Sequence, residues 1–170
     1  METITMDLIP LLQKEMEQEA EITRKMLEIV PSDKLTWQPH PKSMSLGKLA
    51  AHVAELPGWV AMVFDTEELD FQNNPYEPKK VTSTQDILEY FEASLKSGRE
   101  ALAAANPDTL SEEWVLRNGE NILSKRTKYE VIRMSYCQIV HHRAQLGVFL
   151  RLLNVPIPGS YGPSADEMPF

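Results

Sequence analysis

The stretch that decides the fold spans Tyr136 to Pro158, with the sequence YCQIVHHRAQLGVFLRLLNVPIP. Its apolar residues recur every three or four positions, which predicts one long amphipathic helix over most of the stretch. Two adjacent histidines, His141 and His142, lie in the middle of that helix. Gln138 precedes His142 by four residues, so these two side chains share one helix face. Polar side chains on an apolar stripe need a partner or a function.

This helix is predicted to be the last of four. It begins at a capping box, Thr127-Lys128-Tyr129-Glu130, and ends near Leu153, with Asn154 as the C-cap. The same helical spacing of apolar residues occurs three times earlier in the chain. The earlier helices are predicted over about 7–30, from Leu46 through Val60 after an N-cap at Ser45, and from a second capping box at Ser83–Asp86 to about Ala105.

Two features depart from the helical pattern. Pro57 lies inside the second helix and is expected to bend or interrupt it. Apolar residues within 113–124 flank Asn118-Gly119, a pair favoured in type I′ turns, which predicts a small two-stranded hairpin. The polar segment Thr66–Thr82 is predicted to be a surface loop. Four amphipathic helices and one small hairpin make an all-α bundle, and no break in composition divides residues 1–170 into more than one domain.

Composition and charge narrow the classes of function. The chain carries 25 acidic and 17 basic residues and a formal net charge of −8, which argues against nucleic-acid binding. The short basic cluster 124–128 is expected to be a solvated loop before a helix. No apolar run reaches membrane-spanning length and no signal peptide is apparent. The single cysteine, Cys137, excludes an internal disulfide, so we expect a cytoplasmic protein.

The spacing of the histidines selects a candidate site. On a helix His141 is rotated about 100° from His142, toward the side of Cys137, so the adjacent pair cannot easily hold one ion. The i, i+4 pair of Gln138 and His142 can do so. In the second helix His52 lies at the inner edge of the apolar stripe. His52 is therefore the candidate partner of Gln138 and His142.

Three segments resemble the DinB-like family, the damage-inducible four-helix bundles of bacteria, which are distinct from the DNA polymerase of that name. The segments are TWQPHPKSMSLGKLAAHVAELPGW (36–59), VHHRAQLGVFLRLLNVPIP (140–158) and YGPSADE (161–167). They lie near both ends of the chain in the family's order, and the middle third carries little resemblance. The resemblance implies an all-α, up-down-down-up four-helix bundle, commonly a homodimer.

The resemblance also implies a divalent metal, held by one histidine of the second helix and two in an H-x-x-x-H motif of the fourth. His52 matches the first ligand and His142 the last. Gln138 stands where the family has its remaining histidine. Imidazole suits Zn and Ni, whereas an amide oxygen is a poorer ligand for them. Relatives include thiol-dependent S-transferases and a mycothiol-dependent maleylpyruvate isomerase, so a low-molecular-weight thiol is an expected cofactor.

Two functional hypotheses follow. The first is a metal-dependent enzyme of the DinB-like type, resembling thiol S-transferases or hydrolases, with a metal site of His52, Gln138 and His142 that the glutamine weakens. The second is a non-catalytic or vestigial dimeric bundle that binds a small ligand or a partner. In that case His52 and His142 are core-edge histidines, bonded to each other or to Gln138.

Other polar residues keep two interpretations each. Arg143 either orients the site or binds a carboxylate substrate, or else forms a salt bridge between helices or subunits. Cys137 with His141 is either a thiolate pair or, as we expect, a small buried thiol beside a surface histidine. Glu55 and Asp166 are carboxylates that would complete a metal site if the fold brought either one near. Tyr161, Ser164 and Asp166 either rim a pocket or hold the C-terminal tail.

Overall fold

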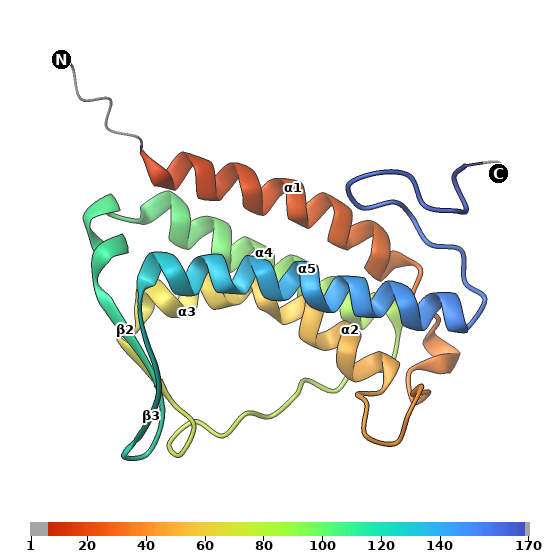
Figure 1. Cartoon of the computed structure of the whole chain (residues 1–170), viewed down its shortest axis with the longest axis horizontal. Coiled ribbons are helices and arrows are strands. Elements are labelled where there is room, and N and C mark those ends of the chain that lie inside the picture. Colours follow the sequence, from red (N-terminus) through yellow and green to blue (C-terminus); the bar gives the residue numbers. More distant parts are fainter. Residues whose placement is uncertain (1–6, 169–170) are drawn as a thin grey trace.

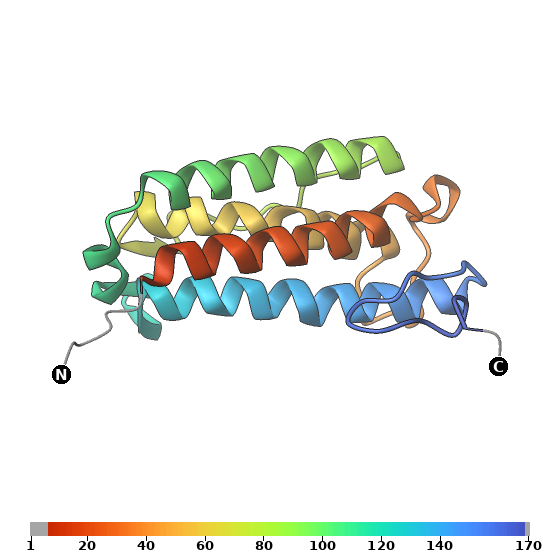
Figure 2. The same ribbon diagram turned by 90° about the horizontal axis from the view of Figure 1, so that it is seen from above.

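The computed structural model describes residues 7–168. Its long helices lie side by side along the longest axis, and a small sheet extends from one end (Figures 1 and 2). The helices are α1 Leu8–Glu28, α2 Leu46–Glu55, α3 Trp59–Asp65, α4 Thr84–Ala104 and α5 Lys128–Leu152. Short 3-10 turns cover Ser32–Lys34, Leu56–Gly58 and Pro107–Ser111. The strands are β1 Glu68–Asp70, β2 Glu113–Asn118 and β3 Asn121–Thr127.

The helix boundaries follow the predicted caps closely. Ser45 accepts a hydrogen bond from Lys48 N at the start of α2, and Thr127 and Glu130 form the reciprocal capping box of α5. Ser83 caps α4 as expected, but the Asp86 carboxylate reaches back to Thr82 N, one residue earlier than the predicted box requires. At the end of α5 the C-cap is Leu153 and not the predicted Asn154, which follows it in a left-handed conformation with φ 58°, as a residue beyond a helix end often does.

The predicted second helix forms as two pieces, because Pro57 interrupts it. A 3-10 turn over Leu56–Gly58 separates α2 from α3, since proline has no N–H for the helical ladder. The Ser135 hydroxyl of α5 donates to the Leu56 carbonyl at 2.8 Å in a buried position. On the other side α4 approaches so closely that a Cβ on Gly98 would lie 2.4 Å from the Pro57 carbonyl oxygen. The interruption is therefore held between α4 and α5.

The predicted hairpin forms as β2 and β3, but the sheet is not limited to these two strands, and the prediction that all of Thr66–Thr82 is a surface loop was wrong. Part of that loop is β1, which pairs in parallel with β2, so the sheet has three strands in the order β1-β2-β3. The fold is thus mostly helical rather than purely α. The buried carboxylate of Asp70 holds the edge strand β1 in place, since it accepts hydrogen bonds from Gly119 N at 2.8 Å and from Gln72 N at 3.0 Å. The sequence did not predict β1, because a strand of three residues is too short to show an alternating pattern of apolar and polar residues.

The hairpin turn also differs from the predicted one. The two residues between the paired ends of β2 and β3 are Gly119 and Glu120, not Asn118 and Gly119. Of these two turn residues, only Gly119 has a positive φ, 59°. This is the pattern of type II′ turns, which have glycine at the first central position. The basic cluster expected in a loop lies mostly in β3, and Lys128 at its end is buried and paired with Glu112 at 2.9 Å.

A single apolar core joins the helices. It contains the buried faces of all five helices, α1 to α5, with the Trp114 side chain entering it from the sheet. Trp37 covers one end of the bundle, and its ring meets Phe149 edge-on at 5.7 Å between centroids. Within residues 7–168, none of the helices combines the length and the hydrophobicity needed to span a bilayer.

We expect Gly98→Ala to destabilise the protein by about 1–3 kcal/mol, because the added methyl group would overlap the Pro57 carbonyl and the Met16 side chain. Glycine to alanine inside a helix otherwise stabilises by about 0.5–1 kcal/mol. Urea unfolding of the variant and of the exposed neighbour control Ser97→Ala measures the difference. Equal stability of Gly98→Ala and wild type would contradict the close approach.

Candidate functional site

The structure brings His52 of α2 and His142 of α5 together, two of the three residues selected from the sequence. Their ring centroids lie 4.5 Å apart, and the rings meet edge-on at 78°. Both side chains are partly buried at the border of the core. The contact follows from register, because each histidine occupies the edge of the apolar stripe of its own helix.

Each of these imidazoles is oriented by a polar neighbour on its own helix. His52 Nδ1 lies 2.6 Å from Glu55 Oε1, and His142 Nδ1 lies 2.9 Å from Gln145 Oε1. When Nδ1 donates its proton to such an oxygen, the lone pair is on Nε2. This is the orienting arrangement commonly found behind histidine metal ligands. Both Nε2 atoms are therefore the candidates for binding an ion.

Burial favours the neutral form of His142. Loss of hydration lowers the pKa of its imidazole, the nearby His52 and His141 lower it further, and the hydrogen bond to Gln145 opposes the change. A histidine must be neutral to ligate a metal. His142 is thus in the form that a ligand requires near neutral pH.

Glu55 connects the histidine pair to two phenols. Tyr76, in the loop after β1, donates to Glu55 Oε1 at 2.8 Å, and Tyr90 of α4 donates to Oε2 at 3.3 Å. Burial, with the Glu55 charge, raises the pKa of Tyr90 to about 12 and raises the pKa of Tyr76 as well. Of the two carboxylates considered from the sequence, Glu55 is therefore the one beside His52, although its oxygens already have three partners.

Gln138 lies one turn before His142, as its spacing predicts, but it lines a depression of the surface to which His52 does not belong. With Met134, Cys137, His141 and His142 it lines a shallow depression of ≈ 490 Å³, and His52 does not contribute to that lining. Within the described part of the chain, no three His, Cys, Asp or Glu side chains form a group able to hold a metal ion. The observed cluster is therefore two histidines, with Gln138 beside one of them.

The expectation of a buried thiol at position 137 was wrong. Cys137 is a free, exposed cysteine, since it belongs to the face of α5 that is turned to solvent. His141 is exposed too, with its ring 4.8 Å from that of His142. This places His141 outside the contact with His52, as the 100° rotation on the helix implies.

Arg143 serves as an interhelical salt bridge, one of the two interpretations left open by the sequence. It is 1% exposed and donates to Glu19 Oε2 at 2.6 Å and to Thr23 Oγ1 at 3.0 Å on α1. Its other terminal nitrogen donates to the Tyr161 hydroxyl at 2.8 Å. The arginine thus ties α5, α1 and the C-terminal tail together.

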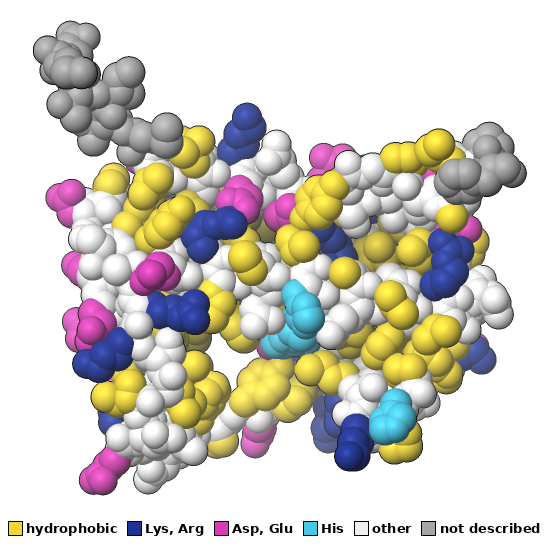
Figure 3. All heavy atoms as spheres, viewed as in Figure 1, with side chains coloured by type: hydrophobic (Ala, Val, Ile, Leu, Met, Phe, Trp, Pro, Cys, Tyr) yellow, Lys and Arg dark blue, Asp and Glu magenta, His cyan; other side chains and the backbone are white. Residues whose placement is uncertain are grey.

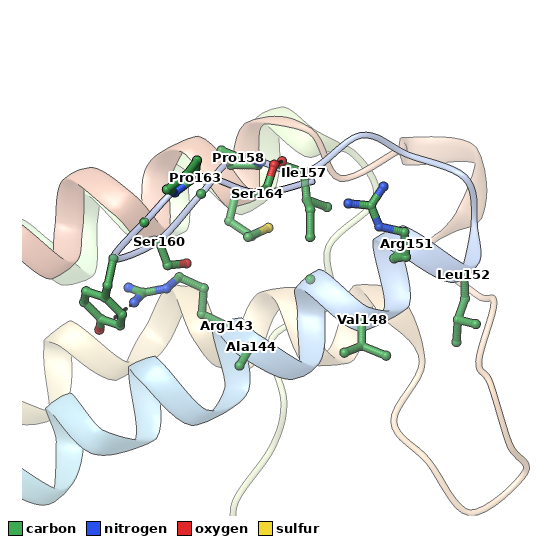
Figure 4. A pocket seen from close by; sticks show the side chains of 15 residues that line it. Arg143, Ala144, Val148, Arg151, Leu152, Ile157, Pro158, Ser160, Pro163 and Ser164 are labelled. Atoms are coloured by element: carbon green, nitrogen blue, oxygen red, sulfur yellow. Dashed lines mark hydrogen bonds between the residues drawn. The ribbon is translucent and has the colours of Figure 1, made fainter. Parts of the chain in front are cut away.

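The tail is fastened at a second point, and a pocket lies beneath it. Arg151 donates to both oxygens of Asp166, which also accepts from Ile157 N at 2.9 Å. Asp166 is consequently engaged in the tail and not beside His52. The pocket, ≈ 540 Å³, lies between the tail and α5, with Arg143 and Arg151 at its margin (Figure 4). Tyr161, Ser164 and Asp166 therefore hold the tail, and the first two also line its pocket.

A second pocket, here named the His52 pocket, adjoins the histidine pair on the side of the sheet. Its volume is ≈ 520 Å³, and His52 and Glu55 form its polar end. Figure 3 shows a hollow with hydrophobic side chains around it, next to the histidines at the centre of the face. Sequence reasoning missed this pocket because its walls come from helices, strands and a loop together. One pattern in the sequence could have indicated a wall of this pocket. It is the recurrence, every three or four residues across Pro57, of His52, Glu55, Trp59 and Met62.

Comparison with known proteins gives a consistent family assignment. The family model described as "DinB family" matches residues 1–169. An uncharacterized protein of Bacillus subtilis, YrdA, is 25% identical over 154 residues, which is 91% of this chain and 88% of that protein. Among solved structures, a DinB-like protein of Bacillus subtilis, YjoA, has a TM-score of 0.69 at 17% identity, covering 88% of this chain and 97% of that one. A DinB-like protein of Bacillus cereus has a TM-score of 0.67 at 20% identity, covering 88% and 95%. At these identities the structural likeness establishes the fold alone.

We expect Glu55→Gln to lower the pKa of Tyr90 from about 12 while leaving it above the ordinary value of 10.0, because burial persists after the charge is removed. The raised pKa contributes stability that is fully present below the unfolded pKa of about 10 and is lost as pH rises through the folded value. The variant therefore loses this contribution at a lower pH. NMR titration of labelled tyrosine rings measures it, with Glu89→Gln on the exposed face of α4 as the control. An unchanged Tyr90 pKa in Glu55→Gln would contradict the role of this carboxylate.

Proposed function

Because this chain belongs to the DinB family, we propose that it is a metal-dependent enzyme of thiol S-transferase or hydrolase type, with a divalent ion held by His52, Gln138 and His142. The observation that carries the proposal is the meeting of two imidazoles from α2 and α5 at 4.5 Å, each with its Nδ1 engaged by a neighbouring oxygen. Core-edge histidines need no such pair of orienting partners.

The donor set fits an ion that prefers imidazole. With Gln138 turned from its own depression toward the histidine pair, two Nε2 atoms and its amide oxygen would provide three protein ligands and leave positions open, as in catalytic zinc sites. The amide is the weak member, because a neutral oxygen is a poorer ligand for Zn or Ni than imidazole. We therefore propose weaker binding than three histidines would give.

When bound, the ion would lower the pKa of a coordinated thiol or water and so supply a nucleophile near neutral pH. The residues of the chain have separate tasks around it. Glu55 holds the Nδ1 proton of His52, and the hydroxyls of Tyr76 and Tyr90 hold Glu55 in turn. Gln145 orients His142 through its Nδ1. These bonds keep both rings in place before any ligand arrives, which lowers the cost of assembling the site.

The second candidate function is a non-catalytic bundle that binds a small ligand or a partner. Gln138 favours it, because this residue weakens the chemistry while preserving the helix spacing. The proposal also includes the up-down-down-up order of the helices, a homodimer and a low-molecular-weight thiol as co-substrate, all of which rest on the family resemblance. Metal binding distinguishes the two candidates.

We expect His142→Ala to weaken Zn or Ni binding by about tenfold or more, a loss of at least about 1.4 kcal/mol. His141→Ala is the matched control and should bind as the wild type does, because its side chain lies outside the contact with His52. Calorimetric titration of protein purified without a histidine tag measures both affinities. A wild-type protein that takes up neither ion, or equal losses in the two variants, would eliminate the metal hypothesis.

We expect Gln138→His to raise Zn or Ni affinity by about tenfold or more, because a third imidazole replaces the amide. Thermal shift with each ion gives a second readout, since a ligand that binds only the folded state raises the melting temperature. Gln18→His, on the exposed face of α1, controls for the mere addition of a histidine. If Gln138→His gains no more than that control, the three positions do not converge on one ion.

A further inference from the structure

The His52 pocket has a chemical character that the histidine pair alone does not specify. One wall is the stripe of His52, Glu55, Trp59 and Met62, which continues across the interruption at Pro57. The sheet contributes Trp114 and Leu116 from β2, which face the same side because side chains two apart on a strand do so. Leu69 of β1 lies opposite Leu116 in the register of the sheet. The pocket is therefore mostly apolar, and the polar side chains in its lining are His52, Glu55, Asn74, Glu77 and the hydroxyl of Tyr76.

Four aromatic rings from three different elements surround this space. Trp59 belongs to α3, Trp114 to β2, and Phe71 and Tyr76 to the loop after β1. Trp114 is fixed by its indole N–H, which donates to Thr66 Oγ1 at 3.0 Å. Tyr76 is fixed by its bond to Glu55 at 2.8 Å. Because several aromatic faces and edges line the His52 pocket, it favours a planar, apolar ligand.

The charges in the lining exclude one class of guest. Among the described residues, the ionisable side chains that line the pocket are His52, Glu55, Glu77 and the Tyr76 phenol, whose pKa is raised, and no Lys or Arg contributes. Lys79 does not line the pocket and lies over the ring of Tyr90, with its Nζ 4.3 Å from the centroid. In the metal-free protein, a carboxylate or phosphate bound here would lose its hydration, meet two carboxylates and find no Lys or Arg side chain, which is costly.

We propose that the His52 pocket binds an uncharged, largely aromatic small molecule as the substrate of the adjoining site. The role of this molecule as a substrate rests on the proposed function. The binding itself follows from the shape and charge of the pocket. The volume, ≈ 520 Å³, is within the range usual for pockets that take small molecules, about 300–1,000 Å³. The reactive part of the molecule would lie at the end where His52 and Glu55 are placed.

Two naphthalene probes of equal size test the class of ligand. Naphthylmethanol is uncharged and naphthoate is an anion, and both are titrated by calorimetry in the presence of EDTA, so that no metal takes part. We expect naphthylmethanol to bind and naphthoate to bind about tenfold more weakly or worse. Equal affinities, tighter binding of the anion, or no binding of the alcohol at about 1 mM would overturn the proposal.

The tryptophans report where the probe binds. The chain has three; Trp59 and Trp114 line the pocket, whereas Trp37 packs on Phe149 at the end of the bundle. We expect naphthylmethanol to shift the indole N–H signals of Trp59 and Trp114 in NMR spectra and to leave that of Trp37 unchanged. A shift confined to Trp37 would assign the probe to another surface and overturn the proposal.

Variants that fill the pocket complete the test. Leu116→Trp of β2 and Met134→Trp of α5 narrow it from two independent elements, so either one that keeps the wild-type circular dichroism spectrum is informative. We expect about tenfold weaker binding of naphthylmethanol in each. Ile122→Trp, at an exposed position of β3, is the matched control and should bind normally. If the filled variants bind as well as the control, the pocket is not the binding site. Metal titration of the same proteins without EDTA is scored separately, so a failed metal site and a failed pocket are distinguishable.

Discussion

The interruption at Pro57 is the constraint on which the geometry of the site depends. Proline removes one donor from the helical ladder, and a 3-10 turn takes the place of a regular turn there. The turn is not a free hinge, because Ser135 holds the Leu56 carbonyl and Gly98 lets α4 approach the Pro57 carbonyl. A side chain at position 98 would push α4 away from the turn. The direction in which α3 leaves α2 is thus set by two neighbouring helices.

With the turn fixed, a stripe of side chains on α2 and α3 faces a stripe of side chains on α5. His52, Glu55, Trp59 and Met62 form one stripe on α2 and α3, and positions 131, 134, 138 and 142 also recur every three or four residues on α5. At one end His52 meets His142, and at the other Val131 and Met134 join Trp59 and Met62 around the pocket. The polar pair and the apolar pocket are therefore successive parts of one interface between helices, and the strand residues only complete its outer wall.

The sequence predicts the local part of this arrangement well. Helix ranges, the caps at Ser45 and Thr127 and the break at Pro57 depend on interactions within a few residues, which spacing and capping rules describe. The pairing of β1 with β2 joins segments about 45 residues apart and depends on Asp70, whose partners come from the hairpin turn. Spacing also selected His52 and His142 correctly as neighbours. It did not give the direction of Gln138 or the exposure of Cys137, because these depend on how far α5 is rotated about its own axis against α2.

Glu55 is the residue through which the two parts of the interface affect one another. Its carboxylate holds His52 Nδ1 and accepts the Tyr76 hydroxyl, and Tyr76 is also part of the loop that bounds the pocket. A molecule that displaces Tyr76 removes one partner from Glu55, which strengthens the hold of the remaining charge on the His52 proton. A carboxylate bound more strongly to Nδ1–H makes the opposite nitrogen of the imidazole a better ligand. In the proposed site, occupation of the pocket and the affinity of His52 for an ion would therefore be coupled through a single side chain, whether residue 138 is glutamine or histidine.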